Sequence, residues 1–375
     1  MENLPATLNV SLPPSAGADG GAKSLPLPRN ITPEAGTSCN AGNRPCGSSS
    51  GAAPPGPKLV GIARLAQSSP RLRQRTGVQC FALPARSALN RESSRRMPFA
   101  WTLNPYRGCE FGCKYCYARY THEFMELHDG RDFERKIFAK TGSPGLLRAE
   151  LRRARDRGLP IALGTATDPY QPAEKQYRIT RAMLGVFGEF EGLDFSITTK
   201  SALILRDLDL LASLARQNRL SIHMTVTTLD ARLARLIEPK APPPLKRLQA
   251  VRELTAAGIR TGVNAAPILP GLTDAPSQLD RLARAAAEHG AQFFFGNVLF
   301  LMPSAMAQFM PFLKKEYPQL VQRYRKLYRH SAYLSREYKD VVTRLVAELR
   351  ARYHLDGRLQ EPTARLHRQY ALAFK

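Results

Sequence analysis

The chain has 375 residues, with 55 Lys and Arg against 31 Asp and Glu, which gives a formal net charge of +24 at pH 7. Its hydrophobic content of 43% is enough for a substantial core, and no stretch is long and apolar enough to span a membrane, so no membrane partner is expected. The charge favours a polyanionic partner such as nucleic acid, although a high-GC genome that encodes Arg in place of Lys also produces basic chains.

The first 98 residues divide into two parts. Residues 1–60 are rich in Pro, Gly, Ser and Ala, so they cannot bury enough apolar surface to offset the entropy of ordering and are predicted to be disordered. They begin without the basic and apolar pattern of a signal peptide, which favours a cytoplasmic protein. Residues 61–98 carry eight Arg and one Glu. We interpret them as a basic arm that either follows phosphate groups or packs on the core as a solvated extension.

A loop with three cysteines follows the first predicted strand, 99–104. Cys109, Cys113 and Cys116 stand at x3/x2 spacing, and no cysteine follows them in the chain. Three thiolates on one short loop can hold three irons of a [4Fe–4S] cube and leave the fourth iron open to a small molecule. An open iron is a reactive position, so the loop indicates an enzyme.

A structural zinc site is the alternative interpretation of this loop. Zinc takes four Cys or His ligands, and His122 is close enough in sequence to be the fourth. Zinc motifs usually come as two separated pairs, so the spacing favours the cluster. A zinc-dependent nucleic-acid-binding protein stays open as a function of a different class.

Downstream, short apolar segments alternate with amphipathic ones. The predicted strands are 99–104, 160–165, 195–199, 220–226, 262–268 and 293–299, and the predicted helices are 174–190, 207–217, 231–237, 244–257 and 276–289. This α/β alternation is typical of βα units on a parallel sheet, which either curls into a barrel or lies open and doubly wound. No Gly-x-Gly-x-x-Gly follows the first strand, which removes the dinucleotide-binding version.

The end of the chain, residues 306–375, is predicted to be a basic helical extension, with mostly helical sequence from Pro311 onward. Its cations are interleaved with five tyrosines, Tyr317, Tyr324, Tyr328, Tyr333 and Tyr338. At helical spacing we expect these tyrosines to pack the helices against the core, and the cations to offer a binding face.

The cysteine loop resembles the signature of the radical SAM superfamily, in which an aromatic residue, here Tyr115, precedes the last cysteine. The flanks and later motifs resemble the spore photoproduct lyase-like branch, also called DNA repair photolyase-like. They are Asn104-Pro-Tyr-Arg-Gly-Cys109, Gly164-Thr-Ala-Thr-Asp168, Thr199-Lys200-Ser201, Glu238-Pro239 and Pro267-Ile-Leu-Pro270. The resemblance covers residues 99–300. It implies a partial (β/α)6 TIM-type barrel over residues 99–305, with its chemistry at the carboxyl ends of the strands.

The resemblance also implies the cofactors and the residues that contact them. The cofactors are a [4Fe–4S] cluster on Cys109, Cys113 and Cys116, and S-adenosylmethionine (SAM), which is cleaved reductively to a 5′-deoxyadenosyl radical. By motif position, the residues that bind SAM are Tyr115, Thr167, Asp168, Lys200, Thr225 and Asn264. Tyr117 matches a tyrosine of a radical relay and is the catalytic candidate. Packing or helix capping is the structural alternative for these side chains.

One departure from spore photoproduct lyase concerns the hydrogen donor. That enzyme has a further cysteine in the loop after the second strand, where this chain has Thr165 and no thiol. A threonine O–H bond is too strong to replace an S–H donor, so a lyase-like enzyme with a different donor is implied. Its expected partners are nucleic acid on the basic surface and an electron donor such as flavodoxin or ferredoxin, with the protein a monomer. Modification of RNA or of a protein by the same radical stays open.

Overall fold

The computed structural model describes residues 59–75, 77–92 and 97–357. The segment that we predict to be disordered, residues 1–58, lies outside the described residues, as do Cys39, Cys46 and the last 18 residues of the extension, 358–375. Within the described ranges, no helix is both long and apolar enough to cross a membrane.

A curved sheet of seven strands forms the centre, in the order β11-β10-β9-β8-β7-β4-β3. Six of the strands run parallel, and β3 pairs antiparallel with β4 at one edge. Their bounds are β3 Leu89–Arg91, β4 Trp101–Leu103, β7 Ile161–Leu163, β8 Asp194–Thr199, β9 Arg219–Thr225, β10 Arg260–Ile268 and β11 Phe294–Val298. Because the six parallel strands are ordered as in the chain, the sheet is wound in one direction only. It is a partial TIM-type barrel, as predicted, and not a doubly wound sheet.

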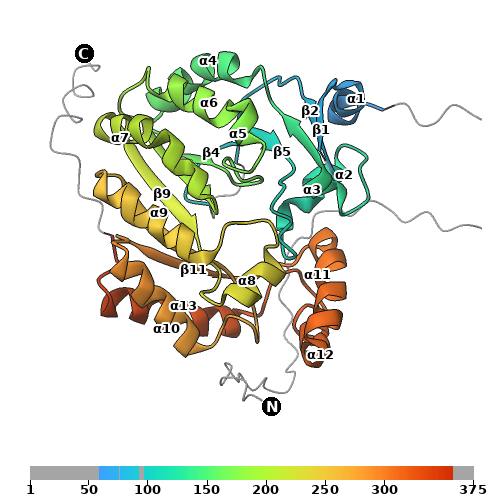
Figure 1. Cartoon of the computed structure of the whole chain (residues 1–375), viewed down its shortest axis with the longest axis vertical. Helices are drawn as coiled ribbons and strands as arrows, with labels where there is room; N and C mark the ends of the chain where they lie inside the picture. Colours follow the sequence, from blue (N-terminus) through green and yellow to red (C-terminus); the bar gives the residue numbers. More distant parts are fainter. Residues whose placement is uncertain (1–58, 76, 93–96, 358–375) are drawn as a thin grey trace, which may run out of the picture. The chain divides into compact units, whose positions relative to one another are not determined.

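Helices cover the outer face of this sheet (Figure 1). They are α4 Ser143–Asp156, α6 Ile179–Phe187, α7 Leu208–Gln217, α8 Ala231–Ile237, α9 Pro244–Ala256 and α10 Pro276–Glu288, with a 3-10 turn at Ala202–Asp207. Strand β8 shows how the two faces differ. Phe195 is buried against Phe187 of α6, with ring centroids 4.6 Å apart, whereas the alternating Ser196 and Thr198 are partly exposed. The helix-covered face is therefore apolar, and the opposite face carries small polar side chains.

One predicted helix, 174–190, is wrong as a single element. It is broken at Arg178, whose φ of 50° is left-handed, into α5 Glu174–Tyr177 and α6. The reason is a buried carboxylate: Glu174 accepts hydrogen bonds from the backbone amides of Thr180 (3.0 Å) and Arg181 (3.2 Å). Glu174 thus caps a helix that starts after it, and the apolar periodicity gives no sign of this.

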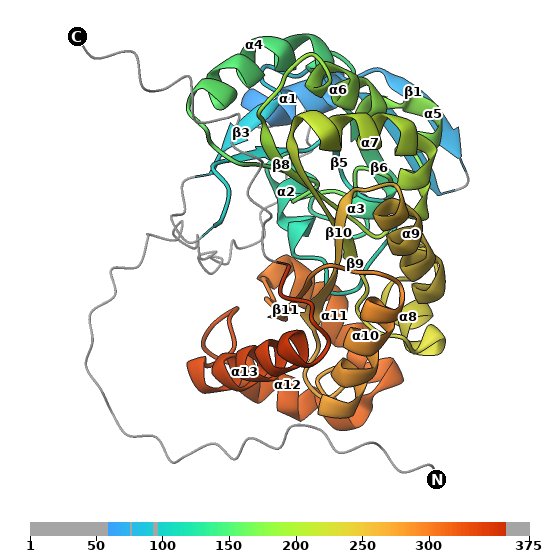
Figure 2. The same cartoon turned by 90° about the vertical axis from the view of Figure 1, so that its left-hand side faces the viewer.

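The segment interpreted as a basic arm is folded where it is described. It contains α1 Gly61–Ser68, β1 Arg71–Arg75, β2 Val78–Ala82 and β3. β1 and β2 join β6 Lys136–Ala139 and β5 Tyr106–Arg107 in a second, four-stranded sheet of order β1-β2-β6-β5. Three short helical elements follow the cysteine loop, η1 Tyr117–Arg119, α2 Tyr120–Glu123 and α3 Asp132–Arg135. In the turned view the four-stranded sheet lies at the opposite end from α11 to α13 (Figure 2).

The C-terminal extension is helical, as expected, but starts earlier, at α11 Pro303–Glu316, with Pro311 inside the helix. A 3-10 turn Pro318–Leu320, α12 Val321–Leu327 and α13 Arg336–Arg352 follow. Packing by the tyrosines is confirmed for Tyr324, Tyr328 and Tyr338, which are buried. Tyr338 donates a hydrogen bond of 2.6 Å to Asp274, which fixes α13 to the loop before α10. Tyr333 differs, because its side chain is largely exposed.

Candidate active site at the cysteine loop

The cysteine loop leaves the sheet after β4 and β5, at the carboxyl end of the first parallel strand. Its entry needs a glycine, because Gly108 has a φ of 81° and a Cβ there would lie 2.8 Å from the carbonyl oxygens of both Phe133 and Lys136. Cys113 is buried, Cys109 and Cys116 are partly exposed, and none of the three forms a disulfide. The loop therefore presents three thiols from a backbone that has little room to move.

Neighbouring segments hold the loop through its backbone. The amide of Cys109 donates to the carbonyl of Phe133 (2.9 Å), and the amide of Lys114 donates to the carbonyl of Ile237 (2.9 Å). Gln171 accepts from the amide of Glu110 (3.0 Å) and donates to the carbonyl of Gly108 (3.1 Å). Sequence reasoning missed Gln171, although it lies only three residues after Asp168, the last residue of a motif that we quote.

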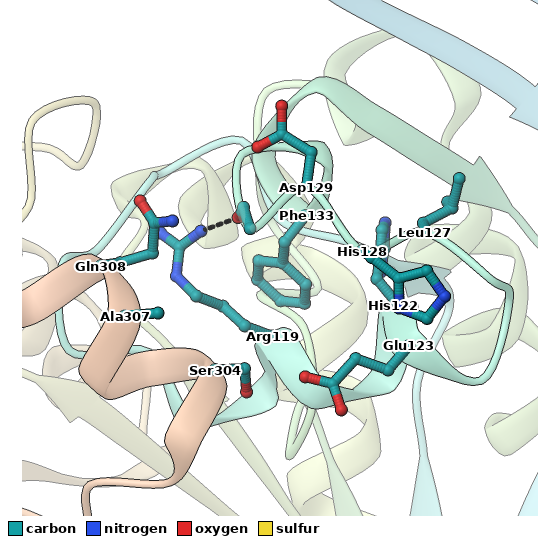
Figure 3. A pocket seen from close by; sticks show the side chains of 11 residues that line it. Arg119, His122, Glu123, Leu127, His128, Asp129, Phe133, Ser304, Ala307 and Gln308 are labelled. Atoms are coloured by element: carbon teal, nitrogen blue, oxygen red, sulfur yellow. Dashed lines mark hydrogen bonds between the residues drawn. The ribbon is translucent and has the colours of Figure 1, made fainter. Parts of the chain in front are cut away.

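Arg119 supports the loop from another side. Its Nη2 donates to the carbonyl of Cys113 (3.0 Å) and is paired with Glu134 at 2.6 Å. Arg119 also lines a cavity of about 220 Å³ between the residues after the cysteine loop and α11, and donates to the carbonyl of Gly130 at 2.5 Å (Figure 3). None of the three cysteines lines this cavity. The cavity therefore lies beside the cysteine loop, and the thiols do not line it.

His122 does not face the thiols as a fourth ligand would. It is buried between the rings of Phe133 and Phe138, at centroid distances of 5.2 and 5.9 Å, and its Nε2 lies 3.0 Å from the carbonyl of Lys136. Over the described residues, no three Cys, His, Asp or Glu side chains gather closely enough to hold a single metal ion. Because His122 is held between the two rings and against the carbonyl of Lys136, the loop offers three cysteines without a fourth ligand, a set that suits a cluster whose irons take one thiolate each.

The loop after β7 places Thr167 and Asp168 beside the cysteine loop. Thr167 donates to the carbonyl of Gly108 (2.6 Å). The carboxylate of Asp168 accepts from the hydroxyl of Thr199 (2.7 Å) and from the amides of Lys200 (2.7 Å) and Tyr170 (2.9 Å). Burial raises the pKa of Asp168 in spite of these bonds. Both side chains join the ends of β7 and β8 to the cysteine loop, and their contact with SAM stays a prediction.

A buried charge network lies next to Cys113. Glu238 and Arg247 form an ion pair of 2.6 Å with each side chain 1% exposed, and Lys200, 17% exposed, lies 4.0 Å from the other oxygen of Glu238. Tyr115 and Thr227 both donate hydrogen bonds to Glu238, the second at 2.8 Å. From the sequence, Glu238 appears only as one residue of a quoted motif. Arg247 is missed, because a cation within a predicted amphipathic helix is normally expected to be exposed to water.

The charges of this network affect the pKa values of Cys113 and Lys200. Burial raises the pKa of Cys113 to about 12, and the cation of Lys200 opposes that rise. Burial disfavours the charge on Lys200, but Cys113 and Glu238 outweigh it and raise the pKa of Lys200. Its Nζ also lies 5.8 Å from the ring centroid of Tyr115. Lys200 therefore stays charged beside Cys113, as the predicted contact with SAM, through the carboxylate of SAM, would require.

The remaining predicted residues lie on β9, on β10 and directly after the last cysteine. Thr225 is buried at the end of β9, where its carbonyl accepts from Arg247 (3.1 Å). Asn264 lies opposite Thr225 on β10 and is partly exposed. Tyr117 is 39% exposed, and its hydroxyl donates to the carbonyl of Thr165, the position where the expected thiol is missing. Desolvation of this hydroxyl, which lies against the carbonyl of Thr165, raises the pKa of Tyr117.

Comparison with known proteins agrees with this geometry. The profile of the family described as "Radical SAM superfamily" matches residues 103–284, from the end of β4 through α10. Uncharacterized protein Rv2578c of Mycobacterium tuberculosis is 39% identical over 304 residues, which cover 81% of this chain and 88% of that protein. The chain belongs to the radical SAM superfamily. Uncharacterized protein MJ0683 of Methanocaldococcus jannaschii is 27% identical over 219 residues, 58% of this chain and 77% of that protein.

Solved structures show the fold of this radical SAM chain. Spore photoproduct lyase complexed with a dinucleoside spore photoproduct superposes with a TM-score of 0.56 over 79% of this chain and 85% of that chain, at 14% identity. At this identity the likeness concerns the fold alone.

Proposed function

We propose that the protein is a radical SAM enzyme that holds a [4Fe–4S] cluster on Cys109, Cys113 and Cys116 and cleaves SAM reductively. The observation that carries the proposal is the loop itself: three cysteines without disulfides, on a fixed backbone, in a chain of this superfamily. When bound, the cluster would supply one electron that breaks the S–C5′ bond of SAM, giving methionine and a 5′-deoxyadenosyl radical.

The side chains around the loop would bind and orient the second cofactor. Lys200 is a partly buried cation whose partner Glu238 is shared with Arg247, so it can add a charge-assisted hydrogen bond to the carboxylate of SAM. Tyr115 lies within the cysteine loop and is fixed by its hydrogen bonds to Glu238 and Thr227 (3.1 Å). Its ring can form one wall of the pocket for SAM. Tyr117, at the mouth of the site, is the proposed relay residue.

The net charge of +24 supports a nucleic acid as the substrate. The reaction would resemble that of a lyase acting on a modified base, with a hydrogen donor other than a thiol in the loop after β7, because that loop has Thr165 and no cysteine. The electron would come from a donor such as flavodoxin or ferredoxin.

Anaerobic reconstitution tests the proposal. We expect a brown protein with about four irons per chain that releases 5′-deoxyadenosine from SAM when dithionite is added, measured by liquid chromatography and mass spectrometry. Cys113→Ala should lose both properties. Cys80→Ala is the matched control, because Cys80 is also buried but lies in β2, outside the loop; it should keep both. A colourless, zinc-loaded protein that never cleaves SAM would disprove the proposal.

A further inference from the structure

Three aromatic rings form a continuous row that starts at the cysteine loop. The ring centroids of Tyr117 and Phe300 are 6.3 Å apart, and those of Phe300 and Tyr333 are 4.4 Å apart with an interplanar angle of 28°. These separations are those of interacting aromatic pairs. We call Tyr117, Phe300 and Tyr333 the aromatic row.

The row joins the two ends of the open barrel. Tyr117 directly follows Cys116 after the first parallel strand, and Phe300 follows β11, the last one. Tyr333 lies farther out, in the loop between α12 and α13. A planar ligand that enters along the row therefore moves from the outer loop to the residue next to a cysteine ligand.

Packing within the protein accounts for the other tyrosines of the extension but not for this row. Tyr324, Tyr328 and Tyr338 are buried, whereas Tyr333 is 59% exposed and Tyr117 is 39% exposed. Both rings contact Phe300, and a substantial fraction of each side chain stays exposed to water. Stacked, solvent-exposed rings indicate a surface for a ligand with flat faces.

The charge around the row selects the class of ligand. The Nζ of Lys339 lies 5.9 Å from the ring centroid of Tyr333. Residues 303–352, which include α11 to α13, contain eleven Lys or Arg and four Asp or Glu, a net charge of +7. Exposed acids are present, among them Glu337 and Asp340, but cations are in excess. Aromatic faces beside cations suit a chain of bases joined by phosphates.

We propose that the aromatic row is a stacking platform for unpaired bases of a single-stranded nucleic acid, which it guides toward the cysteine loop. A duplex keeps its bases stacked on one another and offers no free base face, so the strand must be single or locally opened. The proposal rests on the proposed function for what happens to the bound strand, but binding to the row does not require SAM cleavage.

Fluorescence anisotropy with the full chain tests the platform. A short fluorescein-labelled oligo(dT) is titrated with wild type, Tyr333→Ala, Tyr333→Phe and Lys339→Ala over a range of salt concentrations. Tyr333→Ala should weaken binding about fivefold or more, the loss expected for one base–aromatic stack, with an unchanged salt slope, and Tyr333→Phe should bind as wild type. Lys339→Ala should reduce the salt slope by about one.

Phe124→Ala is the matched control, because Phe124 is 60% exposed but, within the described part of the chain, its ring contacts only the ring of Tyr120; it should bind as wild type. The platform is overturned if Tyr333→Ala binds like wild type, if Phe124→Ala loses as much affinity, or if a hairpin duplex or poly-glutamate binds as tightly as oligo(dT). SAM cleavage without nucleic acid is measured separately, with Phe124→Ala as the variant expected to match wild type. Failure of cleavage with intact Tyr333-dependent binding would count against the proposed function alone.

Discussion

Replacing Glu238 by Gln tests the buried charge network beside the cysteine loop. The ion pair with Arg247 spans 2.6 Å with both side chains 1% exposed, and Lys200 adds a second cation 4.0 Å from the carboxylate. Gln keeps the shape of the side chain but removes its charge. Both cations would then be left without their counter-ion, Arg247 fully buried and Lys200 only partly exposed.

The expected loss of stability follows from that burial. Neutralising one partner of a buried ion pair costs about 3–5 kcal/mol, which in a domain of this size lowers the midpoint of thermal unfolding by roughly 6–10 °C. Urea unfolding of wild type and Glu238→Gln, followed by circular dichroism, measures the loss. Adding Arg247→Met to Glu238→Gln should recover part of it, because the uncompensated guanidinium is then removed.

The matched control is an ion pair on the surface. Glu189 and Arg148 are 2.5 Å apart, as close as the buried pair, but their side chains are 42% and 49% exposed. Water replaces the lost charge interaction there, so Glu189→Gln should cost about 0–1 kcal/mol. Equal losses in Glu238→Gln and Glu189→Gln, or a Glu238→Gln protein as stable as wild type, would refute the reasoning.

Three further predictions concern packing, pH and cofactor binding. A Cβ at Gly262 would lie 2.2 Å from the ring of Phe293, so Gly262→Ala should destabilise the fold by about 1–3 kcal/mol. Gly185 in α6 is the control: apart from its chain neighbours and its own helix backbone, no atom lies within 4 Å of the place that a Cβ would take, so Gly185→Ala should stabilise the fold by up to about 1 kcal/mol. Urea unfolding compares the two variants. Burial lowers the pKa of His122 from 6.5 to about 4, so between these values the unfolded chain takes up a proton that the native protein does not, and stability falls as pH falls. Thermal melts should show a smaller fall in His122→Gln, and equal pH dependence in both proteins would contradict this. Lys200→Met should weaken SAM binding by about tenfold or more, as loss of a charged hydrogen bond does, and unchanged affinity in equilibrium dialysis would exclude the contact.

The order of strands and helices could be predicted from the sequence because the elements of the barrel are consecutive. Short apolar segments place β8, β9 and β10 within two residues of their observed ends. The break at Arg178 could not be predicted in this way, because the carboxylate of Glu174 that causes it acts through the folded chain. The folded state of residues 61–92 was missed for the same reason: β2 is stabilised by pairing with β6, which is more than 50 residues away.

The candidate site was predictable where its chemistry is local. Three cysteines within eight residues identify the loop, and the strand-end position of Lys200 follows from the βα alternation. The ion pair of Glu238 and Arg247 was not predictable, because the two residues belong to different elements and only the fold buries both. The aromatic row likewise combines residues separated by more than 200 positions, and the spacing of the tyrosines alone favours packing for all of them.

Electron paramagnetic resonance of the reduced, reconstituted protein tests the central claim most directly, because it reports on the iron that the three cysteines leave open. Adding SAM should change the signal of the reduced cluster in wild type and in Cys80→Ala, while Cys113→Ala should show no such cluster. A spectrum that is the same with and without SAM, from a protein that contains a full complement of iron, would contradict the account.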